Sequence, residues 1–310
     1  MTLVVLSGPT ASKKSYLADL FFDKYKSRII NSDSMQIYNE MPILTAQPED
    51  RNIEGKYALY TSLDYREKCT VAKYAKLAVA EIENALQENK IPILVGGTGL
   101  YIKSILDGLI IIPEISQKIK RKVFEDFENL GKEGFYAQLL KKDPAVADKI
   151  RPSDTTRMIR AMEVFMQTGK SISEFKDNIK KLYTGDYLHI SLFPERVTLY
   201  EWCEKRFDAM IKSGVVDEVK DFIARREPSE GKYGVEASLG YQDIKNYLSG
   251  EIDMDEVKDK TKQATRNYAK RQLTWSRNQM PNKKCLHYSD IKEAEDEFFN
   301  LLSDFIPKDS

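Results

Sequence analysis

Short apolar runs alternate with helical patterns along the first hundred residues. Residues 3–6, 28–30 and 91–95 are brief, mainly aliphatic runs, typical of strands buried on both faces of a parallel sheet. Residues 13–22 and 71–86 instead repeat apolar side chains at the helical spacing i, i+3, i+4 and i+7, which indicates amphipathic helices. Strands that alternate with helices predict an α/β fold, with a parallel sheet flanked by helices.

The pattern changes in the middle of the chain. Residues 113–181 are charged, helical in pattern and poor in strands, whereas the apolar run 188–192 is typical of a strand that returns to the sheet. We therefore predict an α/β catalytic core formed by residues 1–115 and 187–310, interrupted by an all-helical insertion domain at residues 116–186. Ligands of parallel sheets bind at the carboxyl ends of the strands, so the loops at those ends are the first candidates for a site.

The amino-acid composition excludes several classes of protein. Hydrophobic residues make up 42% and charged residues 31% of the chain, which excludes a disordered or fibrous protein. The 48 basic residues balance 48 acidic ones, which excludes a uniformly basic protein that coats nucleic acid. Three distant cysteines and two histidines argue against a disulfide framework and a zinc finger. Without an apolar run of about 18 residues, we expect no membrane span and a cytoplasmic location.

One stretch near the C-terminus is strongly basic despite the overall balance. Residues 256–284 contain nine basic and two acidic residues, and the block also carries Tyr268 and Trp275. A solvated helix face explains such a block, and a groove that faces nucleic acid explains it equally well. Composition alone leaves both interpretations open.

The turn after the first strand has the length and ending of a Walker A loop. Residues 8–15 read GPTASKKS, compared with the pattern GxxxxGK[ST]. In such a loop, backbone N–H groups and a helix N-terminus hold a di- or triphosphate, Lys14 supplies positive charge, and the Ser15 hydroxyl holds Mg²⁺. The second glycine of the pattern is Lys13 in this chain. The alternative is a structural turn that no longer binds phosphate.

Two more loops with polar or glycine residues follow predicted strands. Asp33 comes just after the second strand, where a carboxylate serves as a general base or a magnesium ligand, or merely as a helix N-cap. Residues 96–99 read GGTG, so glycines allow close backbone approach and Thr98 offers a hydroxyl. Because all these loops lie at carboxyl ends of parallel strands, we expect them to converge on one crevice.

Seven segments together resemble the tRNA dimethylallyltransferase (tRNA isopentenyltransferase) family of the bacterial type, in the family's order over residues 3–277. They are GPTASKKS, DSMQIY, IPILVGGTGLYIKSIL, RMIRAMEVF, RFDAM, SLGYQDI and TRNYAKRQLTWSR. The resemblance implies that the dimethylallyl group of dimethylallyl diphosphate moves to the exocyclic amine of the adenosine 3′ to a tRNA anticodon, with loss of diphosphate. It also implies a P-loop-like core with a helical insertion domain, and we expect a monomer.

The resemblance further implies roles for individual residues. Asp33 matches the family's general base, Arg206 its diphosphate-contacting arginine, and Thr98 a residue near the reacting adenosine and the bridging oxygen. The expected diphosphate contacts are Gly8, Thr10, Ala11, Ser12, Lys13, Lys14 and Ser15, with Mg²⁺ at Ser15. The expected tRNA contacts are Ser34, Met35, Gln36 and Thr98 in the core, Arg157 and Arg160 in the insertion, and Lys270, Arg271 and Gln272 in the basic block.

The chain departs from the family pattern at four places. Lys13 replaces a glycine, residues 44–48 read LTAQP in place of GTAKP, residues 56–59 read KYAL in place of Pro-His-His-Leu, and Thr156 replaces a glutamine. An active tRNA prenyltransferase is the leading hypothesis. A catalytically weakened paralogue that still binds tRNA is the second, and a small-molecule P-loop kinase or a prenyltransferase for free adenine nucleotides is the third.

Lys13 gives rise to two opposite expectations. If the loop needs a positive φ at this position, a lysine is strained there, and the Lys13→Gly variant binds diphosphate more tightly. If the ammonium instead attracts diphosphate, the same change weakens binding. We expect the strain account to hold, because Lys14 and Arg206 already provide cations.

Overall fold

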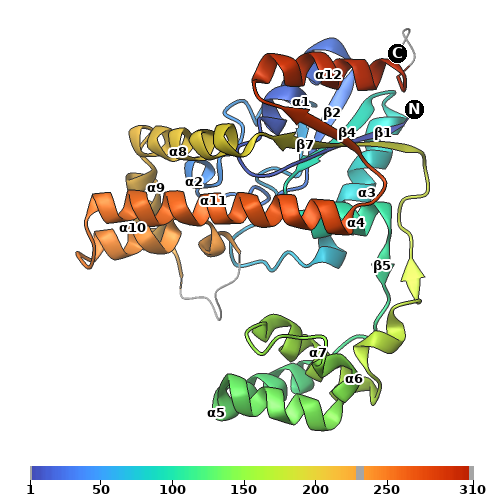
Figure 1. Cartoon of the computed structure of the whole chain (residues 1–310), viewed down its shortest axis with the longest axis vertical. Helices are drawn as coiled ribbons and strands as arrows, with labels where there is room; N and C mark the ends of the chain where they lie inside the picture. The colour runs from blue at the N-terminus through green and yellow to red at the C-terminus, as the bar shows by residue number, and fades with distance from the viewer. Residues whose placement is uncertain (1, 228–233, 307–310) are drawn as a thin grey trace. The chain divides into compact units, whose positions relative to one another are not determined.

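Among the described residues, 2–227 and 234–306, six strands form one parallel sheet in the computed structural model (Figure 1). The order is β3-β2-β4-β1-β7-β8, and every neighbouring pair runs parallel. The four apolar runs that predicted strands lie in β1, β2, β4 and β7. The strands are β1 (Leu3–Ser7), β2 (Ser27–Asn31), β3 (Tyr57–Ala58), β4 (Ile91–Gly96), β7 (Tyr187–Pro194) and β8 (Lys284–Tyr288).

Helices cover both faces of this sheet, as a parallel sheet with two apolar faces requires. On one face, α1 and α12 pack against strand residues such as Val4, Ile29 and Ile93. On the other face, α3 lies against β2 and β4, and α4 packs against α3. The helices are α1 (Lys14–Lys24), α2 (Pro42–Thr45), α3 (Val71–Gln87), α4 (Gly99–Leu106), α8 (Arg196–Lys212), α9 (Val215–Arg225), the 3₁₀ turn η2 (Val235–Ala237), α10 (Tyr241–Leu248), α11 (Met254–Gln279) and α12 (Ile291–Ser303).

Helix α3 fixes the end of the strand that precedes Asp33. Its start is capped by Thr70, whose hydroxyl accepts a hydrogen bond from the Lys73 amide at 3.1 Å, as N-cap threonines do. Most of its apolar stripe is buried, and within that stripe the Tyr74 hydroxyl donates to the Asn31 carbonyl at 3.0 Å. The helix therefore contributes packing and one anchoring hydrogen bond at the carboxyl end of β2.

A second compact unit extends from Gly108 to Lys181, and the rest of the chain forms the first unit. The sequence placed the insertion at 116–186. The bounds differ because β5 (Leu109–Ile110) and β6 (Ile179–Lys180) pair antiparallel within this unit, which is otherwise helical. Its separate core contains Val123, Phe135, Leu139, Met158 and Met162. Its helices are α5 (Gln117–Lys142), α6 (Pro144–Ala147), α7 (Thr155–Thr168) and the 3₁₀ turn η1 (Ile172–Phe175).

Across both described ranges, no helix combines the length and apolar character that crossing a membrane would need.

Candidate active site

The loop between β1 and α1 is tightly curled. Ala11 and Lys13 both have left-handed backbone conformations, with φ of 63° and 62°. Helix α1 begins directly after Lys13, so the amides of its first turn have no partners within the helix and are available to an anion. The strand, the curled loop and the helix N-terminus therefore have the backbone arrangement typical of a phosphate-binding loop, and phosphate binding at residues 8–15 stays a prediction.

Two cations lie beside this loop without a carboxylate partner. The Lys14 ammonium donates to the Pro9 carbonyl at 2.6 Å, and Arg206 on α8 donates to the Thr10 hydroxyl at 2.5 Å. Burial lowers the pKa of Lys14 to about 8; Asp33 opposes this shift, and the charge of Arg206 adds to it. Neither cation forms an ion pair with another described residue. An anionic ligand would supply the missing countercharge.

Asp33 follows β2 and is held in place by its own turn. Its amide donates to the Asn31 side-chain oxygen at 2.8 Å, and the Asn31 amide group donates back to the Asp33 carbonyl at 3.0 Å. Its Oδ1 accepts the Met35 amide at 2.9 Å, whereas Oδ2 accepts no hydrogen bond from the described residues. A fixed carboxylate with one free oxygen is suited to accept a proton from a ligand.

The glycine loop after β4 packs directly against the Asp33 segment. A Cβ atom added at Gly96 would lie 2.0 Å from the Ser32 carbonyl oxygen, so only glycine permits this approach. The Thr98 hydroxyl accepts the Ser34 amide at 3.0 Å and donates to the Ser34 hydroxyl at 3.3 Å. Thr98 therefore fixes Ser34 in this structure. Asp33 lines two cavities, which are described below, and the described lining of neither includes Thr98.

Gln272 of α11 joins the two glycine loops, and its expected contact with tRNA stays a prediction. Its Oε1 accepts the Thr10 amide at 2.7 Å, and its Nε2 donates to the Gly97 carbonyl at 2.9 Å. One turn away, Trp275 packs so closely on Gly99 that an added Cβ would meet the indole at 2.0 Å. With both ends of its amide engaged inside the protein, Gln272 acts here as a clamp between loops.

Two cavities meet at Asp33. A cavity of about 590 Å³ is lined by the loop residues Thr10 to Ser15 together with Trp202. A cavity of about 320 Å³ is lined by residues that include Ser34, Met35, Tyr268 and Arg271. Both cavities are also lined by the same four residues, Thr10, Asp33, Gln36 and Arg206. The larger cavity therefore contains the curled loop with its cations, and the smaller cavity lies away from most of that loop. Asp33 and Arg206 lie where the two cavities meet.

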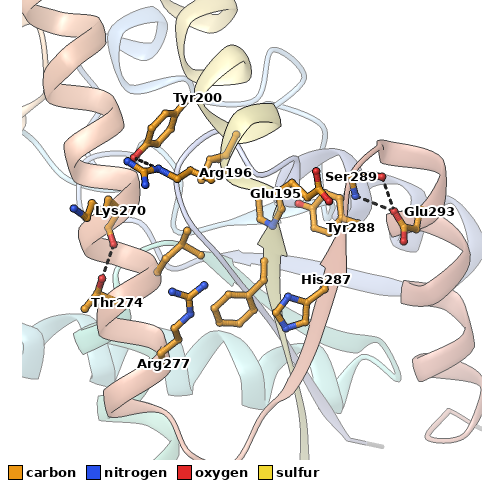
Figure 2. Close-up of a pocket in the computed structure, with 14 residues that line it drawn as sticks. Glu195, Arg196, Tyr200, Lys270, Thr274, Arg277, His287, Tyr288, Ser289 and Glu293 are labelled. Atoms are coloured by element: carbon orange, nitrogen blue, oxygen red, sulfur yellow. Dashed lines mark hydrogen bonds between the residues drawn. The ribbon is translucent and has the colours of Figure 1, made fainter.

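The three consecutive residues expected in the basic block point in three directions. Successive helix residues are rotated by about 100°, so Gln272 contacts the loops and Arg271 lines the smaller cavity at Asp33. Lys270 instead borders a separate cavity of about 490 Å³ beyond the ends of β7 and β8. Figure 2 shows this third cavity, with Lys270, Thr274 and Arg277 on α11, Arg196 and Tyr200 on α8, and Tyr288, Ser289 and Glu293 on the opposite side.

The two arginines expected in the insertion lie on α7 of the second unit. Arg157 pairs with Asp154 at 3.3 Å, and Arg160 pairs with Glu163 at 3.2 Å. Arg157 is exposed. Their contact with RNA stays a prediction.

Two contributors to the site were not assigned to it from the sequence. Trp202 lies one helical turn before Arg206 on α8, and the Lys13 ammonium stands 5.5 Å from its ring centroid. The i, i+4 spacing of Trp202 and Arg206 was a usable signal, because such residues share a helix face. Glu218 of α9 accepts hydrogen bonds from the amides of Ile43 and Leu44. That contact joins segments distant in sequence and leaves no local pattern.

Comparison with known proteins identifies the family of this chain. The IPP transferase family model matches residues 36–279. The tRNA dimethylallyltransferase of Rickettsia conorii is 40% identical over 295 residues, 94% of this chain and 81% of that protein. The full-length tRNA isopentenylpyrophosphate transferase of Bacillus halodurans superposes with a TM-score of 0.69 at 28% identity, over 98% of this chain and 96% of that one. A eukaryotic dimethylallyltransferase acting on tRNA superposes with a TM-score of 0.84 at 26% identity, over 98% of this chain and 79% of that one. The chain belongs to the IPP transferase family.

Proposed function

We propose that this enzyme transfers the dimethylallyl group of dimethylallyl diphosphate to the exocyclic amine of the adenosine 3′ to the anticodon of a tRNA. The observation that carries the proposal is the meeting of two cavities at Asp33 and Arg206, with the phosphate-type loop on one of them. A diphosphate at the loop and an adenine at the other end would bring the allylic carbon and the amine together there. The names of the relatives support the same reaction.

On the diphosphate side, the protein stabilises the leaving group. The allylic C–O bond breaks while negative charge grows on the departing diphosphate, and preorganised donors and cations stabilise that charge. Lys14, Arg206 and the first-turn amides of α1 supply them. Lys14 and Arg206 already lie at the loop, held by the Pro9 carbonyl and the Thr10 hydroxyl. Little reorganisation is therefore needed when the diphosphate binds.

On the nucleoside side, Asp33 accepts the proton. The exocyclic amine of adenine is a weak nucleophile, so a carboxylate that removes its proton as the new C–N bond forms lowers the barrier. The free Oδ2 of Asp33 fits this role, since Oδ1 is engaged by the Met35 amide. Gln36 and Arg271 line the cavity in which the base would lie, and we propose that Ser34, Met35, Gln36 and Arg271 contact the tRNA.

We propose that Mg²⁺ binds beside the curled loop mainly through the oxygens of the diphosphate, with few protein ligands. The described residues contain no group of three carboxylate, histidine or cysteine side chains that would hold a metal ion unaided. Mg²⁺ bound to phosphates usually keeps several waters and takes few protein ligands. We propose that the Ser15 hydroxyl, in the first turn of α1, holds it. When bound, the ion would neutralise charge on the diphosphate.

We further propose that the enzyme works as a monomer in the cytoplasm. Three free cysteines, one buried, one half-buried and one exposed, suit a reducing compartment. Gel filtration with light scattering tests the monomer, and a 35.7 kDa particle is expected.

Radiolabelled dimethylallyl diphosphate, Mg²⁺ and bulk bacterial tRNA test the reaction directly. The proposal predicts label in the tRNA, at an adenosine beside the anticodon after nuclease digestion. Retained tRNA binding without label would support a weakened paralogue instead. Label on free AMP but not on tRNA would redirect the assignment to a nucleotide prenyltransferase. Heat-denatured enzyme serves as the control.

A further inference from the structure

A carboxylate on α9 holds the short helix α2 from outside. Glu218 accepts the Ile43 amide through Oε1 at 2.7 Å and the Leu44 amide through Oε2 at 2.8 Å. Both oxygens of one side chain are therefore engaged by consecutive backbone donors. Glu218 makes no ion pair within the described ranges, so these two hydrogen bonds are its specific contacts.

Helix α2 needs such a partner because it lacks a cap of its own. Met41 precedes it in a left-handed conformation, with φ of 52°, and provides no side-chain hydrogen bond. The first amides of a helix have no carbonyl partner within it, and Leu44 is buried. Without Glu218, two donors close to the protein interior would lose their acceptors, which is costly.

The other end of α2 holds Gln36. The Gln36 side-chain amide donates to the Thr45 carbonyl at 3.0 Å and to the Ala46 carbonyl at 2.8 Å. Gln36 also lines both cavities that meet at Asp33. The contacts therefore run from α9 through α2 to a side chain beside the carboxylate, along hydrogen bonds of 2.7 to 3.0 Å.

We propose that Glu218 is a positioning residue, which orients Gln36 toward the nucleoside by fixing the segment 42–46 between α9 and the site. The inference rests on the proposed function, because it takes the cavity beside Gln36 to be the one that receives the adenosine. Glu218 itself does not line either cavity at Asp33. It acts through the backbone of α2.

The test compares Glu218→Gln with a matched control on the same helix. The substituted side-chain amide retains one acceptor and turns a donor toward the second backbone amide, so the clamp is broken at nearly constant size. We expect kcat/KM for tRNA to fall about tenfold, while KM for dimethylallyl diphosphate stays within about twofold of wild type, because the phosphate loop is untouched. Asp217→Asn removes the same charge from an exposed neighbour without a described hydrogen bond, and it should behave like wild type.

A double-mutant cycle distinguishes positioning from general loss of structure. If Glu218 acts through Gln36, Glu218→Gln should lower kcat/KM little further in a Gln36→Ala background. Full additivity, with each change keeping its own cost, would overturn the inference. Glu218→Asp keeps the carboxylate on a shorter side chain and should recover part of the lost activity, which a variant that merely fails to fold would not allow.

Hydrogen exchange keeps the inference testable if the proposed reaction is wrong. Mass spectrometry of the whole chain should show faster amide exchange over residues 41–47 in Glu218→Gln and unchanged exchange in Asp217→Asn. Unchanged exchange over 41–47 in Glu218→Gln would overturn the positioning role whatever the substrate. An inactive wild-type protein would count against the proposed function alone.

Discussion

Lys13→Gly separates strain from charge at the phosphate loop. Lys13 has φ of 62° and ψ of 21°, a conformation that costs a non-glycine residue about 1–2 kcal/mol. Glycine relieves this strain, but it adds about 0.5–1 kcal/mol of backbone entropy in the unfolded chain. It also removes the contact of the ammonium with Trp202, worth about 0.5–1 kcal/mol. We therefore expect the free energy of unfolding to change by less than about 1 kcal/mol.

Diphosphate affinity should respond to the charge instead. The left-handed conformation of Lys13 belongs to the fold of the loop itself, so a loop that keeps this conformation on binding carries the same strain in both states, and the strain cancels from the affinity. Cancellation of the strain predicts the opposite of the expectation drawn from the sequence, in which relief of strain tightens binding. Lys13 is exposed and lines the larger cavity, and an exposed ion pair contributes about 0.2–1 kcal/mol. Lys13→Gly should therefore weaken binding of dimethylallyl diphosphate by up to about fivefold.

Calorimetric titration of dimethylallyl diphosphate at two salt concentrations measures the effect. Lys13→Gln is the matched control, because it removes the charge and keeps the strained Cβ. Both variants should bind more weakly than wild type, and the difference should shrink at high salt, where exposed charges are screened. Tighter binding by Lys13→Gly together with unchanged binding by Lys13→Gln would refute this reasoning in favour of strain.

Three further predictions concern half-buried side chains of the site. Affinity for dimethylallyl diphosphate should be constant below pH 8 and weaken above it, because free Lys14 has a pKa of about 8 and the bound diphosphate favours its charged form. Titrations from pH 7 to 9.5 check this, and an unchanged pH dependence in Lys14→Ala would contradict it. Asp33→Asn should keep diphosphate binding but slow the single-turnover rate about 10²–10⁴-fold, and a rate near wild type would remove Asp33 from the base role. Gln272→Leu leaves the Thr10 amide and the Gly97 carbonyl without partners, so it should destabilise the protein by about 1–3 kcal/mol. Denaturant unfolding measures this, and a loss below about 0.5 kcal/mol would argue against the clamp.

The pattern of apolar residues predicted those strands whose own residues are almost all buried. The strands β1, β2, β4 and β7 are buried almost throughout, so their apolar runs were visible in the sequence. Strand β8 was missed because it is an edge strand in which only Leu286 and Tyr288 are buried. The two-residue strands β3, β5 and β6 are too short to show a period.

The candidate site likewise has parts that the sequence predicted and parts that it did not. The loops at residues 8–15, 33–36 and 96–99 follow strands, so the parallel topology alone brought them together. The partners that fix these loops come from far along the chain. Gln272 lies 262 residues from Thr10, and Glu218 lies 175 residues from Ile43. Such contacts depend on how α9 and α11 pack, which no local spacing of side chains reveals.

The distance between Thr10 and Gln272 has a consequence for how the protein is made. Strand β1 leaves the ribosome before β4 and β7, yet it pairs on one side with β4 and on the other with β7. At about 5–20 residues per second, the 262 residues from the loop to its clamp take roughly 13 to 52 seconds to synthesise. Until β4 and β7 have been synthesised and have paired with it, the nascent β1 has unpaired edges, which invite pairing with other chains. The phosphate-type loop is therefore synthesised long before the glutamine that clamps it, and it reaches its final form only after that residue has been added.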